Sequence, residues 1–304
     1  TRCRSVGKFL SLSQLVEEYD ALIRDANKPK TFSRTGYKYL DTKLNGGFQN
    51  GSLNILAAGT GVGKSALALN FAVNVAKIEK RPVAFFSLEM GGQEMLSRMI
   101  SITGHISNKK VATFNLRENQ DIMRVQSALN VLSKLPIYID DSPYIKLPDL
   151  LAKAREINAQ VHGLALIVVD YLQIVDSEIE KGSNQAKAVG KVATSLKALA
   201  RDLNVPVLAL AQLNRHGSGE GSKNEKFSKP KLYDIKDSSQ IEMDADTVMM
   251  LWRESQHKDE AVEEANYVIS LMQEAGVPFT WPVALDLEDA ASLEARTAML
   301  SKET

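Results

Sequence analysis

The chain has 304 residues, of which 44% are hydrophobic and 24% charged, and its 37 Lys/Arg residues balance 37 Asp/Glu residues. This composition is ordinary for a soluble globular protein, so it excludes a collagen, a wholly disordered chain and a disulfide scaffold. A formal net charge of zero also excludes a protein that coats nucleic acid through a globally basic surface, although a local basic patch remains compatible with it.

The only cysteine is Cys3, so no disulfide can form within the chain and a reducing compartment is favoured. No apolar run reaches the ~18 residues that a membrane span needs, and the N-terminus lacks a signal-peptide core. We therefore expect a cytoplasmic protein that does not enter a membrane. The sequence starts with Thr1 instead of methionine, which is compatible with a processed or truncated piece of a longer protein.

Charge is distributed unevenly along the chain. Residues 1–43 carry nine Lys/Arg and five Asp/Glu, whereas residues 254–304 carry three Lys/Arg and eleven Asp/Glu. Two interpretations are open: the basic head of one copy contacts the acidic tail of another, or both ends are ordinary solvated faces.

The first predicted element is a helix over residues 9–26, where apolar side chains recur at helical spacing. Ser11 or Ser13 is its expected N-cap. Residues 28–52 follow and contain several glycines, so we expect a linker and loop that lead into the core.

Beyond this linker, apolar runs of strand length alternate with helix-length periodic segments. Several runs are apolar at every position, which is typical of strands buried on both faces of a parallel sheet. The sequence therefore predicts an α/β fold with a mostly parallel sheet flanked by helices. The predicted strands are Ser52–Ala57, Val83–Ser87, Ile137–Ile139, Leu164–Val169, Val207–Ala211, Thr247–Trp252 and Tyr267–Leu271.

A glycine-rich loop follows the first predicted strand. Residues 58–65 read AGTGVGKS and match the Walker A pattern, except that Ala58 replaces its first glycine. The loop's backbone amides can surround a phosphate, and the dipole of the following helix favours the anion. Lys64 can reach the β- and γ-phosphates, and Ser65 can hold Mg²⁺. The residues expected to bind ATP and Mg²⁺ are Gly59, Thr60, Gly61, Val62, Gly63, Lys64 and Ser65.

Polar residues follow three other predicted strands. Asp170 is the expected Mg²⁺ ligand, because parallel strands present such carboxylates at their carboxyl ends. Glu89 can act as the general base that activates water. Gln212 can sense the γ-phosphate and relay its loss to the adjoining loop. Each also has an ordinary interpretation, as a strand-terminal Asp, a surface Glu before a turn and a capping Gln.

These segments together resemble the C-terminal motor domain of DnaB-type replicative helicases, a hexameric branch of the RecA-like ATPases (superfamily 4) that includes phage-encoded members. The runs SLEM, DYLQ and QLNR are much more specific than a Walker A loop alone. We expect a linker-helix region over residues 1–30, a RecA-like ATPase and helicase domain over residues 31–285, and an acidic C-terminal tail over residues 286–304. The resembling segments, in chain order, are AAGTGVGKSALALN, VAFFSLEMGGQEMLSRM, ALIVVDYLQIV, VLALAQLNR and DIKDSSQIEMDADTVMMLWRE.

The resemblance implies an ATP-dependent replicative DNA helicase that translocates 5′→3′ on single-stranded DNA. The active form would be a homo-oligomer, a hexameric ring with ATP between neighbouring subunits, in a bacterial or phage-infected host cytoplasm. A primase and a helicase loader are the implied partners. Residues 9–26 resemble the linker helix that docks on the next subunit in this family.

The resemblance also assigns roles within the site. Lys64 and Ser65 would contact phosphate and Mg²⁺, and Asp170 would bind the metal. Glu89 would be the catalytic base and Gln212 the γ-phosphate sensor.

In this family, central loops hold the DNA. One loop corresponds here to residues 176–185, and another ends in a motif that usually reads Asp-Leu-Arg-Glu-Ser-Gly. The motif here reads DIKDSS over residues 234–239. Lys236 keeps its positive charge and Asp237 its carboxylate, whereas Ser239 replaces the glycine.

Arg215 is the fourth expected DNA-binding residue. Residues 215–236 carry six Lys/Arg and three Asp/Glu, which supports contact with phosphate independently of the resemblance. No interleaving of aromatic residues is evident, so we expect binding that is independent of base sequence. A long polar loop that binds nothing is the alternative.

The sequence departs from the family at the basic residues that a neighbouring subunit contributes to each ATP site. The family pattern is Lys-x-Arg-x-Gly, whereas residues 271–276 read LMQEAG, and neither possible register contains Lys or Arg. An arginine finger is worth about 10³–10⁵ in rate. Three interpretations stay open: the finger comes from elsewhere, the protein hydrolyses ATP poorly, or this region of the sequence is mis-assigned or altered.

Two other functions are compatible with these features. The first is a RecA-like ATP-binding protein with weak or no unwinding activity, acting as a helicase-associated regulator or recombination mediator; the missing finger is its best support. The second is a ring ATPase that remodels RNA or protein. The helicase is favoured because the base, both metal ligands and the sensor are all present.

Overall fold

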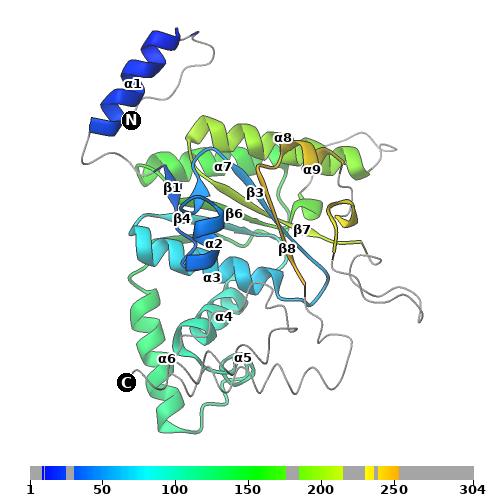
Figure 1. Cartoon of the computed structure of the whole chain (residues 1–304). Coiled ribbons are helices and arrows are strands. Elements are labelled where there is room, and N and C mark those ends of the chain that lie inside the picture. The colour runs from blue at the N-terminus through cyan, green and yellow to red at the C-terminus, as the bar shows by residue number, and fades with distance from the viewer. Residues whose placement is uncertain are drawn as a thin grey trace, which may run out of the picture.

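The computed structural model describes residues 9, 11–24, 31–175, 185–214, 230–235 and 239–252. At its centre lies a six-stranded parallel sheet with the strand order β5-β4-β6-β7-β3-β8 (Figure 1). The strands are β3 (Leu53–Ala58), β4 (Val83–Ser87), β5 (Ile137–Asp140), β6 (Leu166–Asp170), β7 (Val207–Gln212) and β8 (Thr247–Leu251). The predicted mostly parallel α/β fold is confirmed. The predicted strand at residues 267–271 lies outside the described residues.

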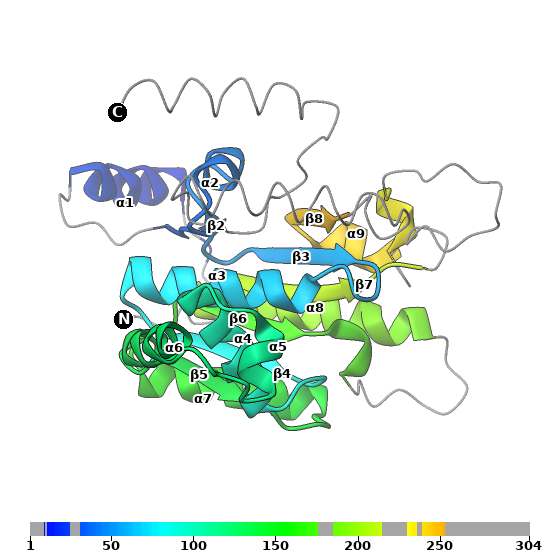
Figure 2. The same ribbon diagram turned by 90° about the horizontal axis from the view of Figure 1, so that it is seen from below.

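Helices cover both faces of this sheet (Figures 1 and 2). Alternate side chains of each strand point into opposite layers: Phe85 packs in one hydrophobic core and Phe86 in the other. Both faces are therefore buried, which explains why the predicted strands contain so few polar positions. The helices that pack in the core with Phe85 are α3 (Lys64–Glu79) and α4 (Gly92–Gly104). Those that pack in the core with Phe86, on the other face, are α7 (Leu147–Gln160), α8 (Gln185–Leu203) and α9 (Ser239–Asp244).

Two further helices, α5 (Asn108–Ala112) and α6 (Asn119–Leu132), pack on α4. They share with α4 a small core of their own, separate from the two cores beside the sheet. This arrangement extends the α4 side of the domain (Figure 1).

The prediction of linker and loop over residues 28–52 is wrong at three short elements, and residues 28–30 lie outside the described residues. Strands β1 (Phe32–Ser33) and β2 (Phe48–Gln49) form a two-stranded antiparallel sheet, and α2 (Lys38–Lys43) lies between them. The Ser33 hydroxyl donates to the Ala165 carbonyl at 2.7 Å, and the fully buried Phe48 ring packs nearly perpendicular to the Phe71 ring, with 5.4 Å between the ring centres. Such short elements show no period in the sequence, so pattern reasoning could not find them.

The predicted N-terminal helix is present as α1 (Leu12–Arg24). Ser11 caps it reciprocally with Gln14: the Gln14 amide donates to Ser11 Oγ at 3.2 Å, and the Ser11 amide donates to Gln14 Oε1 at 2.8 Å. The apolar side chains that the structure describes on it are exposed, Leu12 to 77% and Tyr19 to 67%. None of the described helices is both long and apolar enough to cross a membrane.

Candidate nucleotide-binding site

The predicted phosphate loop connects β3 to α3. Gly61 and Gly63 have φ angles of 74° and 112°, a left-handed backbone that side chains with a Cβ disfavour. No described side chain caps the N-terminus of α3. The first amides of this helix are therefore left to bind an anion, with the helix dipole favouring negative charge.

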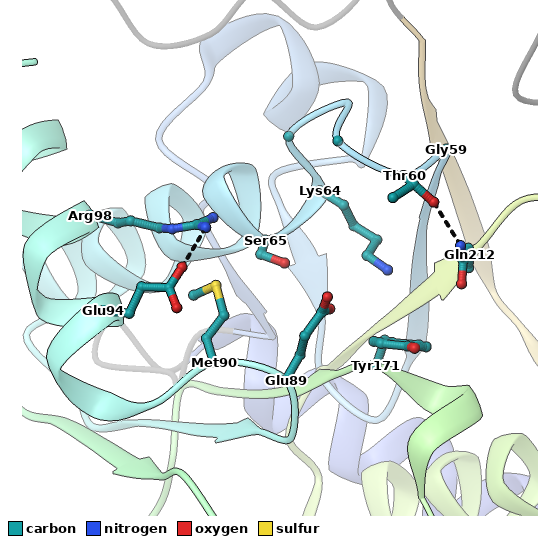
Figure 3. Close-up of a pocket in the computed structure, with 12 residues that line it drawn as sticks. Gly59, Thr60, Lys64, Ser65, Glu89, Met90, Glu94, Arg98, Tyr171 and Gln212 are labelled. Carbon is teal, nitrogen blue, oxygen red and sulfur yellow. Dashed lines mark hydrogen bonds and ion pairs between the residues drawn. The ribbon is translucent and has the colours of Figure 1, made fainter. Parts of the chain in front are cut away.

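A cavity of about 510 Å³ opens beside this loop, at the carboxyl edge of the sheet (Figure 3). The side chain of Val62 does not line it, because that residue is only 6% exposed and packs in the core with α3. The predicted residues that line the cavity are Gly59, Thr60, Gly61, Gly63, Lys64, Ser65, Glu89 and Gln212.

Hydrogen bonds at the ends of β4 and β6 hold Glu89 at this cavity and place Asp170 behind its lining, near Lys64 and Ser65. Ser87 pairs in register with Asp170, and the Leu88 amide donates to the Asp170 carbonyl at 2.9 Å. The Ser87 hydroxyl donates to the Met90 carbonyl at 2.7 Å, which fixes the turn that carries Glu89. The Glu89 side chain points into the cavity from this turn (Figure 3).

Asp170 is fully buried at the end of β6, and neither of its carboxylate oxygens has a hydrogen-bond partner among the described residues. Burial raises its pKa, while the nearby Ser65 hydroxyl and Lys64 ammonium oppose the rise without forming a hydrogen bond of normal geometry to it. Oxygen ligands are those that Mg²⁺ prefers. An unpaired buried carboxylate beside a hydroxyl therefore fits a divalent cation.

The unpaired carboxylate has a consequence for stability. Because its pKa is raised in the folded state, the free energy of unfolding of the nucleotide-free chain should fall as pH rises through that pKa. Asp170→Asn removes the charge, so we expect it to raise the stability at neutral pH by roughly 1 kcal/mol, about 2–4 °C in Tm. Thermal melts of both proteins across pH check this. A clearly lower Tm for Asp170→Asn at neutral pH would contradict it.

Lys64 extends from α3 across the cavity, and its Nζ lies 4.4 Å from the centre of the Tyr171 ring. This is a cation–π distance. Burial lowers the pKa of Lys64, and the negative charges of Asp170 and Glu89 act in the opposite direction. The Lys64 ammonium in the cavity thus lies near two carboxylates, that of Glu89 on the cavity lining and that of the buried Asp170.

Gln212 touches the phosphate loop directly, because its Nε2 donates to Thr60 Oγ1 at 2.8 Å (Figure 3). The next residues continue toward another part of the chain: Leu213 pairs with Ile235, and the Asn214 amide donates to the Asp234 carbonyl at 2.7 Å. The end of β7 therefore connects the phosphate loop to the segment in which the expected DNA motif begins. Sequence reasoning missed this pairing, because the two segments are separated by a long polar stretch.

Four residues that line the cavity were not predicted from the sequence. Tyr171 directly follows Asp170, so the run DYLQ contained a signal for it. Glu94 and Arg98 lie one helical turn apart on α4, and their i, i+4 spacing was the signal for a pair on one face. Met90 belongs to the run SLEM and is nearly buried.

The structure does not place the expected DNA-binding residues. Arg215, Lys236 and Asp237 lie outside the described residues, and Ser239 begins α9 with its side chain undescribed. The segment 271–276, where the basic finger is missing, also lies outside them. These assignments stay predictions.

Comparisons with known proteins agree with the geometry. The family described as the DnaB-like helicase C terminal domain matches residues 33–277. The replicative DNA helicase DnaC of Bacillus subtilis is 38% identical over 256 residues, which are 84% of this chain and 54% of that protein. The replicative DNA helicase DnaB of Geobacillus stearothermophilus is 39% identical over 258 residues, 84% of this chain and 55% of that protein.

Solved structures show the same fold. One that is described as an ATPase domain superposes with a TM-score of 0.73 at 26% identity, covering 83% of this chain and 87% of that one. A DnaB-like replicative helicase, described with its interactions with primase, superposes with a TM-score of 0.70 at 28% identity, covering 81% and 58%. The chain spans about half the length of the curated relatives it matches. With its RecA-like sheet and phosphate loop, the chain belongs to the family of DnaB-like helicase C-terminal domains.

Proposed function

We propose that this chain is the motor of an ATP-dependent replicative DNA helicase that translocates 5′→3′ on single-stranded DNA as a hexameric ring. One observation carries the proposal: the cavity lined by the phosphate loop and Glu89, with Asp170 buried near Lys64, also contains Gln212, and two residues after Gln212 the Asn214 amide donates to the Asp234 carbonyl. A nucleotide site is thus joined to the segment expected to hold DNA. The similarity to proteins named replicative DNA helicases supports this activity.

The side chains predicted from the sequence have proposed roles in ATP hydrolysis. Lys64 binds the β- and γ-phosphates of ATP, and Ser65 and Asp170 hold Mg²⁺, which neutralises phosphate charge when bound. Glu89 accepts a proton from the attacking water, since its carboxylate projects into the cavity from the turn after β4. Its exposed position lets water reach it.

Gln212 reports the state of the nucleotide. Its hydrogen bond to Thr60 ties it to the loop that surrounds the phosphates. When the γ-phosphate leaves, a shift of Gln212 would be transmitted through Asn214 to Asp234 by their backbone hydrogen bond at 2.7 Å. DNA would be held beyond this point by the backbone and side chains of Arg215, Lys236, Asp237 and Ser239.

Replacing Lys236 by alanine tests the DNA contact. One phosphate contact fewer should weaken binding uniformly across sequences and reduce the slope of log K against log salt by about 0.7 for single strands. Fluorescence anisotropy with a labelled oligonucleotide at several salt concentrations measures the slope. Lys109→Ala, an exposed lysine on α5, is the matched control. Equal slopes for the Lys236→Ala variant and the original chain would remove Lys236 from the DNA site.

The exposed apolar side of α1 supports the ring. Side chains such as Leu12, Val16 and Ile23 are 77%, 58% and 63% exposed, and burying them on a neighbouring copy would remove this apolar surface from water.

We propose that residues 1–30 are the linker-helix region, residues 31–285 the motor and residues 286–304 the acidic tail. A primase and a helicase loader are the proposed partners, in the cytoplasm; the solved helicase described with primase supports the first of these.

Unwinding of forked DNA tests the proposal. The chain with ATP and Mg²⁺ should separate a duplex that carries a 5′ single-stranded tail and leave one with only a 3′ tail intact. The Glu89→Gln variant serves as the hydrolysis-deficient control. ATP binding without unwinding of either substrate would instead identify a RecA-like regulator or recombination mediator.

A further inference from the structure

An ion pair within α4 lines the nucleotide cavity without a role in the scheme above. Arg98 Nη2 lies 2.7 Å from Glu94 Oε1, one helical turn earlier. Figure 3 shows this pair on one side of Ser65, with Lys64 extending on the other side. Both members of the pair line the same cavity as the phosphate loop.

Arg98 has hydrogen-bonding capacity that Glu94 does not use. Its Nε is buried and has no hydrogen-bond partner among the described residues. A guanidinium carries five N–H donors in a planar fork that matches phosphate oxygens. The Arg98 side chain is 33% exposed, so part of it remains open to the cavity.

The charges that line the cavity are balanced before nucleotide enters. Among the described lining residues, Lys64 and Arg98 are the basic ones, and Glu89 and Glu94 are the acidic ones. ATP adds several negative charges at once. Glu94 then repels the phosphates and also neutralises the cation that could attract them.

We propose that Arg98 acts in the same subunit as a phosphate-binding catalytic residue, and that Glu94 restrains it. Arg98 leaves Glu94 and donates hydrogen bonds to the γ-phosphoryl oxygens as negative charge moves in the transition state. This inference rests on the proposed ATP hydrolysis and deepens it. It supplies a basic group at the cavity from outside residues 271–276.

The step balances without a proton on Arg98. Water oxygen forms a bond to the γ-phosphorus, the bond from phosphorus to the β–γ bridging oxygen breaks, and ADP takes that electron pair. Glu89 accepts the proton from water and later releases it to solvent. Arg98 contributes charge and hydrogen bonds only, so its effect should appear in kcat more than in ATP affinity.

Steady-state ATPase kinetics with a fluorescent-nucleotide binding assay test the pair. Arg98→Gln should lower kcat by about 10²–10³-fold and change the Kd for ATP far less. Arg98→Lys should recover part of the rate, because it keeps the charge and loses the fork. Glu94→Gln should raise kcat by about two- to fivefold, since a partly exposed ion pair is weak. The double variant Glu94→Gln/Arg98→Gln should match Arg98→Gln alone, because Glu94 acts through Arg98.

Asp202→Asn is the matched control. It breaks an exposed ion pair between α7 and α8, in which Arg155 Nε lies 3.1 Å from Asp202 Oδ2, and these helices cover the face of the sheet opposite α4. Its kcat should equal that of the original chain, and thermal melts should show that all variants fold. An unchanged or lower kcat in Glu94→Gln would overturn the restraint, and an unchanged kcat in Arg98→Gln would overturn the catalytic role. If the original chain itself hydrolyses no ATP, the proposed function fails before the pair is tested.

Discussion

Replacing Lys64 by alanine should lower ATP hydrolysis by at least about 10²-fold and abolish DNA unwinding. Lys64 is the cation that extends into the middle of the cavity, with its Nζ above the Tyr171 ring and near the charges of Asp170 and Glu89. Without it, the two carboxylates face the incoming phosphates with less positive charge to offset them. We therefore expect weaker ATP binding as well as slower turnover.

ATPase assays and nucleotide titrations measure both effects of Lys64→Ala. Lys77→Ala is the matched control, because this exposed lysine lies in the last turn of the same helix, away from the loop. It should leave both quantities unchanged. Hydrolysis by Lys64→Ala at the rate of the original chain would remove the phosphate-loop assignment.

Glu89→Gln should separate binding from turnover. The substitution preserves the shape of the side chain and removes its ability to accept a proton, so kcat should fall by about 10²–10⁴-fold while ATP still binds. The turn that carries Glu89 is held by Ser87 and Met90, not by the Glu89 carboxylate, so the fold should persist. Single-turnover hydrolysis and an equilibrium binding assay provide the two readouts.

Glu156→Gln on α7 is the corresponding control, an exposed glutamate on the other helical layer. It should behave as the original chain in both assays. Loss of ATP binding in Glu89→Gln would instead assign Glu89 a structural role. Full turnover would require another base among the residues that line the cavity.

The sheet was predictable because its strands are buried on both faces. Runs such as Val83–Ser87 and Val207–Gln212 contain almost no polar residue until their carboxyl ends, so their position and their parallel arrangement follow from composition alone. The site followed from the same logic, since Asp170 and Gln212 stand where such strands end. Once these ends meet at one edge of the sheet, the polar side chains must gather there.

Two kinds of feature escaped prediction. The strands β1 and β2 have two residues each, and the register that pairs Phe32 with Gln49 depends on tertiary contacts such as the Ser33–Ala165 hydrogen bond. Arg98 escaped because a helical arginine with a glutamate one turn away usually lies on a solvated surface. Its position in the cavity depends on how α4 packs against α3, which no local pattern encodes.

The rate of ATP hydrolysis with and without single-stranded DNA tests the central claim most directly, at a protein concentration high enough for ring assembly. A motor in which Gln212 links the phosphate loop to the Asp234 segment should be stimulated strongly by DNA, with the stimulation lost in Lys64→Ala. Tight ATP binding with turnover that DNA does not change would contradict the account. The chain would then be a nucleotide-gated scaffold, and the cavity would lack the charge that catalysis requires.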